Sequence, residues 1–411
     1  MVELLTPDVY VQEVPAGPRP IQAVGTRTAA FIGIAPKADA HRGDATAVNN
    51  WLQFTREFTD PDSASTPLSN AVFGFFQNGG SRCFIVNLRR GDNVDAGLRA
   101  LEAEDEIAMV AAPGYTDIGD YSALLSHCEN MGDRVAILDG PLVVDDIERL
   151  TRVGTATAEG VTARRARGAA AGDKKAAGDE PEQEPGLRPP VSDPGFGAFY
   201  FPGITIRDPF GGALIDVAPS GHIAGIWART DATRGVHKAP ANEVIRGALN
   251  VTQRLTRDEQ GVLNPVGVNC IRYFPREGIR VWGARTLADA SSEWRYLNVR
   301  RLFNMIEESI AEATRWIVFE PNDRELWKSI RRDVGAFLTR VWLDGALMGR
   351  TANEAFFVKC DEETNPPEVI DAGTVVAIIG IAPVKPAEFV VFRISQHAGG
   401  VEIETEGGTG G

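Results

Sequence analysis

The chain has 411 residues, with 42 Lys plus Arg against 56 Asp plus Glu, which gives a formal charge of −14. This length exceeds one typical domain, and a hydrophobic content of 43% suffices for a sizeable core, which excludes wholesale disorder. The acidic balance argues against a nucleic-acid binder, whose phosphate affinity needs clustered basic side chains. No apolar run reaches the length of a membrane helix, and the N-terminal residues lack the pattern of a signal peptide. We therefore expect a protein made in the cytoplasm, with no direct membrane insertion.

Two segments near the chain ends have the pattern of strands that lack a core of their own. Residues 8–14 form a short apolar segment between prolines, and residues 388–394 form a second one before a Gly-rich tail. A lone strand must find hydrogen-bond partners for its backbone, so we expect residues 1–25 and 386–411 to be arms that pair with other molecules. The inter-subunit contacts of these arms are expected at Val9, Tyr10, Val11, Val14, Phe389, Val390, Val391, Phe392 and Ile394.

Strand and helix patterns alternate between the first arm and residue 153. Apolar runs at residues 29–35, 82–88, 107–111 and 134–138 are typical of buried strands. Helical patterns separate them, and such alternation indicates an α/β layer with parallel strands. The helices are expected at residues 67–77, 120–131 and 143–153.

Residues 151–195 break this order. The segment is rich in Ala, Gly and Pro, carries seven basic and seven acidic side chains, and has no aromatic residue. So little apolar surface cannot offset the entropy of ordering the chain, so we expect a solvent-exposed insertion on the outside of the molecule. Structured sequence resumes at residue 196, with a further strand expected near residues 223–227.

The last third predicts two long helices with apolar stripes. The first covers residues 292–317, and Glu320-Pro321 ends it. Asn322 is the expected N-cap of the second, with Glu325 three residues further on. Joined by so short a turn, the two helices should pack antiparallel, against each other or over a sheet.

One pattern occurs twice, because residues 30–36 and 377–383 share the sequence AxIGIAP. A short run of small and apolar residues can recur by coincidence, so an internal duplication is one interpretation. The other is that both runs are strands that connect the body to an arm.

The search for catalytic chemistry is mostly negative. The four cysteines lie far apart among apolar residues, which favours buried thiols over a zinc site or a disulfide framework. No phosphate-loop, zinc-protease or nucleophile-elbow motif is present. Ser220 and His222 are close in sequence, but triad partners must meet in space, so a nucleophilic site there is the weaker interpretation. We expect no cofactor, no metal and no catalytic residue, and a protein whose function is its own assembly.

Charge is distributed unevenly along the chain. Residues 272–301 carry seven arginines against three acids, whereas residues 1–24 and 386–411 are acidic. Acidic arms and a basic body can complement each other between subunits, although a solvated helix face explains the same pattern. The possible charged interface comprises Arg280, Arg285, Arg295, Arg300 and Arg301.

Eight runs of residues, in order along the chain, match one known family. They are residues 7–15, 28–33, 75–83, 219–225, 234–242, 298–303, 319–322 and 386–389. These runs resemble contractile phage-tail sheath proteins, including the sheaths of phage-tail-like contractile injection systems. Residues 151–195 match no motif of the family, which leaves the details of the outer domain open.

The resemblance implies an α/β (α+β) fold with three kinds of part. A mixed-sheet core body would be built from residues 26–90 and 235–385, with a subtilisin-like α/β outer domain inserted at residues 91–234 and a strand arm at each terminus. No Asp, His and Ser positions match the protease motifs, so a subtilisin-like hydrolase is only the alternative function.

The resemblance also implies the partners and the mechanism. Subunits would stack as six-membered rings around an inner tube protein, with baseplate and tail-terminator or cap proteins at the two ends. The arms would add strands to a sheet on neighbouring subunits, and contraction would drive the tube through a target envelope. The particle would be a phage tail or a phage-tail-like injection system, assembled in the cytoplasm.

Overall fold

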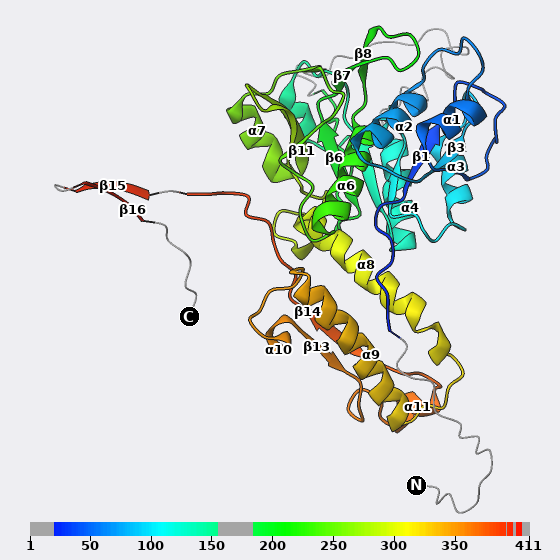
Figure 1. Cartoon of the computed structure of the whole chain (residues 1–411), viewed down its shortest axis with the longest axis vertical. Coiled ribbons are helices and arrows are strands. Elements are labelled where there is room, and N and C mark those ends of the chain that lie inside the picture. Colours follow the sequence, from blue (N-terminus) through cyan, green and yellow to red (C-terminus); the bar gives the residue numbers. More distant parts are fainter. Residues whose placement is uncertain (1–19, 155–183, 392, 398–399, 405–411) are drawn as a thin grey trace, which may run out of the picture.

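The computed structural model describes residues 20–154, 184–391, 393–397 and 400–404. Figure 1 shows a body built on one large sheet, from which the long helix α8 (Leu297–Ala313) leads to a smaller helical unit. A two-stranded hairpin projects from the C-terminal end, away from both parts. Within the described ranges, no helix is long and apolar enough to cross a membrane.

The body is organised around a nine-stranded mixed sheet with the order β2-β3-β1-β4-β5-β6-β11-β12-β9. The six strands from β3 to β11 are parallel, and antiparallel pairs close both edges. The predicted α/β layer with parallel strands is therefore confirmed. The strands are β1 (Ala29–Gly33), β2 (Thr46–Val48), β3 (Cys83–Asn87), β4 (Met109–Ala111), β5 (Val135–Asp139), β6 (Gly197–Phe201), β9 (Glu243–Val244), β11 (Val268–Phe274) and β12 (Gly278–Trp282).

Helices cover both faces of this sheet, which explains why its strands read as continuous apolar runs. Along β1 the side chains alternate, so that Phe31 belongs to one core and Ile32 to the other. The core around Phe31 is closed by α1 (Trp51–Phe58), α2 (Pro67–Asn78) and α6 (Ser220–Arg234). The core around Ile32 is closed by α3 (Val94–Leu98) and α4 (Ile118–Met131).

The strand predicted near residues 223–227 is wrong, because this stretch lies inside α6. Two glycines let α6 approach α2 closely: a Cβ at Gly221 would lie 2.2 Å from the Cα of Ala71, and one at Gly225 would lie 2.5 Å from the carbonyl oxygen of Phe75. A helix without side chains at these positions can bury its whole first half. A buried helix and a buried strand look alike in a short apolar run.

Smaller elements complete the body. The helix predicted at residues 143–153 is only a 3-10 helix at Ile147–Thr151. It begins after Asp146, whose side chain accepts the backbone N–H of Glu148. The described ends of the predicted insertion meet, since Val153 and Arg188 form a parallel bridge. Residues 155–183 lie outside the described residues. The remaining elements are β7 (Ile204–Arg207), β8 (Leu214–Val217), β10 (Asn250–Val251) and α7 (Arg257–Leu263).

The helical unit forms a third core from α8 and α9 (Arg324–Leu343), which confirms that the two predicted helices pack together. The N-cap of α9 is Asp323 and not Asn322, because the Asp323 carboxylate accepts the backbone N–H groups of Glu325 and Leu326. Asn322 instead accepts the indole N–H of Trp327. Beside the helices lie α10 (Ala352–Ala355), α11 (Pro367–Asp371), β13 (Phe356–Lys359) and β14 (Ile378–Ile381).

Both copies of the AxIGIAP pattern include strand residues: the first overlaps β1 from Ala30 to Gly33, and the second contains β14. Strand β14 leads toward the C-terminal segment, and β1 follows the N-terminal segment (Figure 1). The sheet itself runs through the expected domain boundaries near residues 90 and 234, because β3, β4, β6 and β11 all belong to it. A separate outer domain and its subtilisin-like character stay predictions.

Candidate assembly site

The connection from β14 to the C-terminal segment is held against the body by side-chain amides. The Nδ2 of Asn298 donates to the carbonyl oxygen of Val384 at 3.0 Å and to that of His237 at 2.8 Å. Asn298 is buried at the start of α8, so this contact ties the helical unit, the body and the outgoing chain together at one point.

Four residues later, Glu388 is fixed by the body. Its carboxylate accepts Nη2 and Nε of Arg285 at 2.7 and 2.9 Å and Nδ2 of Asn264 at 2.8 Å. Burial alone would raise the pKa of Glu388, but the hydrogen bonds from Arg285 and Asn264 and the charge of Arg285 outweigh it and hold the pKa below its usual value. The acidic arm and basic body therefore meet here within one chain.

Beyond Glu388 the chain leaves the body and exposes apolar side chains. Phe389, Val390 and Val391 are 75%, 69% and 77% exposed. They belong to no strand, so the predicted strand at residues 388–394 is not continuous. A strand begins only with β15 (Arg393–His397), which pairs antiparallel with β16 (Gly400–Glu404) of the same chain, so that Ile394 lies opposite Ile403.

The helical unit contains a small antiparallel sheet of two strands, and residues 346–348 bridge the chain that follows β14. Strands β13 and β14 pair only with each other in the described part of the chain. One face of this sheet packs on α8 and α9, whereas Phe357 and Ile378 are 56% and 48% exposed on the other. The N–H of Ala382 donates to the Ala355 carbonyl, so residues 355 and 382 form a hydrogen-bonded pair. Hydrogen-bonded and non-hydrogen-bonded pairs alternate along antiparallel strands, so the N–H of Val358 points to the outer edge of β13.

The described N-terminal segment is anchored as well. Ile21 is buried in the core of the helical unit, and the guanidinium of Arg340 donates to its carbonyl oxygen. The N–H of Val24 donates to Ser309 Oγ of α8 at 3.0 Å. The last residues of the predicted arm 1–25 are thus packed against α8 and α9. Val9, Tyr10, Val11 and Val14 lie outside the described residues, as does Phe392 on the C-terminal side.

Of the arginines predicted as a charged interface, Arg301 is buried with Asp231 of α6. Its Nη2 and Nη1 lie 2.6 and 3.1 Å from the carboxylate oxygens of Asp231, and its guanidinium stacks on Trp227. Thr26 joins them, because its hydroxyl donates to Asp231 at 2.6 Å and its carbonyl accepts Arg301 at 3.0 Å. This junction connects the N-terminal segment, α6 and α8.

Arg300 is buried too, with its guanidinium 4.0 Å from the ring centroid of Trp294. The structure corrects the expected interface at Arg300 and Arg301, because both guanidinium groups are buried and already have partners inside the subunit. Arg285 is likewise occupied by Glu388. Arg280 and Arg295 are half-buried and donate to neighbouring carbonyl oxygens, and a role for them at an interface stays a prediction.

Ser220 and His222 do not form a nucleophile–base pair. The hydroxyl of Ser220 donates to the buried carboxylate of Asp139 at 2.6 Å, and neither ring nitrogen of His222 has a hydrogen-bond partner among the described residues. Burial raises the pKa of Asp139 to about 6, although hydrogen bonds from Ser220 and Gly114 oppose the shift. Burial lowers the pKa of His222 to about 4. The side chains of Ser220 and His222 are both fully buried, as core residues are.

Sequence comparison connects this architecture with a known family. Residues 90–287 match the model of the phage tail sheath protein central domain, and residues 289–397 match that of the phage tail sheath C-terminal domain. The tail sheath protein of Vibrio phage KVP40 is 32% identical over 177 residues, which cover 42% of this chain and 26% of that protein. A putative prophage major tail sheath protein of Pseudomonas aeruginosa is 28% identical over 47% of this chain and 49% of its own length.

Solved structures extend the likeness to nearly the whole chain. The sheath complex of an extracellular contractile injection system in its contracted state matches with a TM-score of 0.76 and 27% identity, over 96% of this chain and 98% of that one. The contracted helical sheath of the anti-feeding prophage matches with a TM-score of 0.75 and 29% identity, over 95% and 99%. The anti-feeding prophage baseplate in its contracted state includes a chain with 30% identity and a TM-score of 0.72, over 96% and 99%.

The mixed α/β fold of this chain therefore matches that of solved sheath structures. The chain belongs to the contractile tail sheath family. It spans about a quarter of the length of the KVP40 protein that it matches.

Sequence reasoning missed several residues that build this site. Strand β13 lies in a run, Phe356–Lys359, that is too short to be distinguished from a loop. Asp231 lies in the polar C-terminal part of α6, where the sequence pattern does not indicate that its side chain is buried. Asn298 and Arg301 lie within the family run at residues 298–303, which was the one available signal for a structural role.

Proposed function

We propose that this chain is the structural subunit of a contractile sheath that polymerises as stacked six-membered rings around an inner tube. Baseplate and terminator proteins would bound the polymer, and contraction would drive the tube through a target envelope. The proposal rests on membership of the sheath family and on neighbours described as sheath and baseplate complexes. We also propose that it assembles in the cytoplasm and becomes part of a phage tail or a phage-tail-like particle, as its relatives are parts of such particles.

The observation that carries the proposal is the combination of an outgoing apolar segment and an unfilled sheet. The side chains of residues 389–391 are exposed. Among the described residues, β13 and β14 form strand pairs only with each other, so each strand has one edge without a strand partner. An exposed edge is a template for a strand from another molecule, and main-chain hydrogen bonds supply the affinity of such an addition. The arms of neighbouring subunits are the strands that we assign to these edges.

Contraction would then be a rigid-body change. The body and the helical unit are joined by the buried Arg301–Asp231 pair and by Asn298, so each subunit moves as one piece. The arms keep subunits connected while their bodies rotate and slide into more favourable contacts. The energy would be stored during assembly, so no nucleotide site is required. The hydrolase alternative has no observation in its favour, because Ser220 and His222 are not paired.

Truncation tests the proposal. Because Ile21 is anchored in the helical unit and Glu388 in the body, the variants should remove residues 1–19 and residues 392–411 and keep both anchors. We expect folded, monomeric proteins that form no tubes, by circular dichroism, sedimentation and negative-stain electron microscopy, whereas the full chain with its tube protein polymerises. Tubes formed equally well by both truncated proteins would refute the role of the arms.

A further inference from the structure

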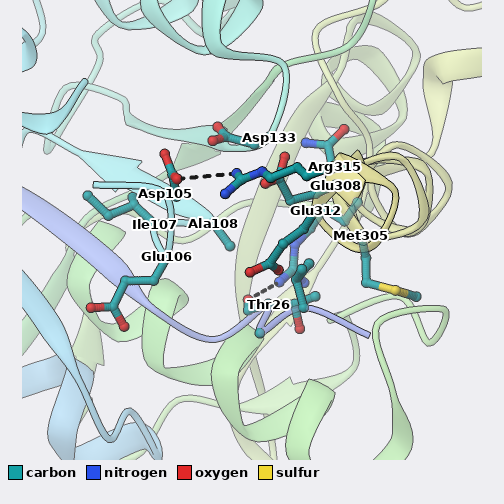
Figure 2. Close-up of a pocket in the computed structure, with 14 residues that line it drawn as sticks. Thr26, Asp105, Glu106, Ile107, Ala108, Asp133, Met305, Glu308, Glu312 and Arg315 are labelled. Carbon is teal, nitrogen blue, oxygen red and sulfur yellow. Dashed lines mark hydrogen bonds and ion pairs between the residues drawn. The ribbon is translucent and has the colours of Figure 1, made fainter. Parts of the chain in front are cut away.

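A cleft of about 220 Å³ lies between α8 and the loops that precede β4 and β5 (Figure 2). Carboxylates surround it: Glu308 and Glu312 of α8 face Asp105 and Asp133 of the two loops. The cleft is thus formed where α8 crosses the body, and the Arg315 side chain that lines it is 67% exposed.

The negative charge of this cleft is incompletely balanced within the subunit. Asp133 pairs with Arg134 at 2.6 Å, and Asp105 lies 3.7 Å from the exposed Arg315. The side-chain carboxylates of Glu308 and Glu312 make no hydrogen bond or ion pair with any described residue. They are one helical turn apart, an arrangement of like charges that weakens an isolated helix. Burial, followed by the carboxylates of Asp133, Asp105 and Glu312, raises the pKa of Glu308, whereas Arg315 opposes the shift.

A buried amide in the same cleft also lacks a partner. Asn304 is 5% exposed, and its Oδ1 accepts Nε of Arg300 at 2.7 Å, which fixes the orientation of the amide. Its Nδ2 then has no acceptor among the described residues, although Asn304 lines the cleft. A buried donor of this kind is unfavourable when it stays unpaired. A cation would balance the carboxylates of the cleft, and a hydrogen-bond acceptor would satisfy Asn304 Nδ2. A basic residue of a peptide chain supplies the cation with its side chain and the acceptor with a backbone carbonyl.

The subunit presents such a residue elsewhere on the body, near the β9 edge of the sheet. Arg276 is exposed at the turn between β11 and β12 and has a left-handed backbone conformation with φ of 71°. Along the adjoining strands, Arg254 lies over Tyr273 with 5.1 Å between the guanidinium carbon and the ring centroid, and the rings of Trp282 and Phe274 pack at an angle of 51°. Exposed Arg, Tyr and Trp are the residues in which protein interfaces are enriched. Neither arginine has a carboxylate partner among the described residues.

We propose that the β11–β12 turn of one subunit inserts Arg276 into the acidic cleft of a second copy of this chain. The guanidinium of Arg276 would pair with Glu308 and Glu312, a peptide carbonyl of the turn would accept Asn304 Nδ2, and Arg254 would face Asp105 at the rim. The two surfaces differ, so the contact is heterologous and propagates from copy to copy, as a ring or helix requires. This inference rests on the proposed self-assembly and adds a body-to-body contact to the arms.

Complementary charge reversals test the pairing. A cleft variant carries Glu308→Arg and Glu312→Arg, and a turn variant carries Arg254→Glu and Arg276→Glu. A control with Arg89→Glu and Arg90→Glu changes the charge by as much as the turn variant, at exposed residues after β3. Circular dichroism and thermal melting establish that each protein is folded, and pelleting with electron microscopy measures assembly with the tube protein.

Each variant alone should assemble at least about tenfold less than the wild type, because like charges then meet at every contact. An equimolar mixture should assemble again, since the unchanged turn of the cleft variant fits the unchanged cleft of the turn variant, and the two reversed surfaces fit each other. Assembly of either variant at the level of the control, or a mixture that stays dissociated, overturns the inference while wild-type tubes leave the proposed function intact. A wild-type chain that forms no tubes refutes both.

Discussion

The carboxylate of Glu388 and the guanidinium of Arg285 form a two-pronged pair, with Nη2–Oε2 and Nε–Oε1 distances of 2.7 and 2.9 Å. Arg285 is held in turn by the side chain of Asn269, whose Oδ1 accepts the Arg285 backbone N–H at 2.7 Å. The pair lies beside a groove of about 520 Å³ that also contains Trp282 and Phe389. The C-terminal arm consequently starts at a fixed point of the body, one residue before its side chains become exposed.

Replacing Glu388 by Gln should release this point. The variant keeps the shape of the side chain but leaves the largely buried Arg285 without its counter-charge, which we expect to cost about 1.5–3 kcal/mol at this contact. Amide hydrogen exchange at residues 385–391 should rise, with the rest of the body unchanged. Phe389→Ser, at an exposed position, is the matched control, and equal exchange in the two variants would contradict the anchor.

The same pair predicts a pH dependence. The pKa of Glu388 is lower in the folded chain than its usual value of 4.5, so its contribution to stability is present above pH 4.5. That contribution is lost as the pH falls below 4.5 through the folded pKa. Protection of residues 385–391 should decrease over this window in the wild type and stay flat in Glu388→Gln.

The buried Arg301–Asp231 pair should be sensitive to the loss of one partner. Both side chains are at most 3% exposed, so Arg301→Met or Asp231→Leu leaves an uncompensated buried charge, at a cost of about 3–5 kcal/mol. The double variant should recover much of this loss, because no unpaired charge remains. Denaturant unfolding measures all three, and a double variant that is as unstable as the sum of the singles would contradict this account.

His222 should make the body sensitive to acid. Its pKa is about 4 when folded and near 6.5 when unfolded, so the unfolded chain binds the proton first. Stability should therefore fall by about 3 kcal/mol as the pH drops from 6.5 to 4. Protonation of Asp139, whose folded pKa is about 6, works in the opposite direction in the same window. The difference between His222→Leu and the wild type isolates the imidazole, and parallel stability curves would contradict its burial as a neutral ring.

Strand addition at β13 can be blocked at a single residue. Proline at position 358 removes an N–H that faces the outer edge and leaves the hydrogen bonds to β14 in place. Val358→Pro should fold, by circular dichroism, and lose tube formation, whereas Val358→Thr should retain it. Tubes of normal length from the proline variant would show that the acceptor edge lies elsewhere.

The elements that could be predicted from sequence are those fixed by local pattern. Apolar runs gave the strands around Phe31 and Ile85, and the stripes of α8 and α9 gave their packing, because these signals depend on neighbouring residues alone. The apolar residues at 389–391 are exposed, and their place in an inter-subunit arm stays a prediction. Buried cysteines were also expected, and all four are buried.

What could not be predicted depends on partners that are distant in the chain. Arg300 and Arg301 read as a basic face, because the aromatic ring and the carboxylate that enclose them come from residues 294 and 231. Part of α6, near residues 223–227, was predicted as a strand, because its short apolar run does not show the burial against α2 that favours a helix. The unpaired charges of the acidic cleft are visible only once α8 is placed across the loops before β4 and β5.

The anchored N-terminal segment determines how the subunit would respond to tension. A pull on residues that precede Ile21 reaches the sheet only past Val24 and Thr26, and these are bonded to Ser309, Arg301 and Asp231. The load would therefore spread sideways into α6 and α8 before it reached β1. A tether attached in this way would drag the whole subunit along and leave its sheet unpeeled.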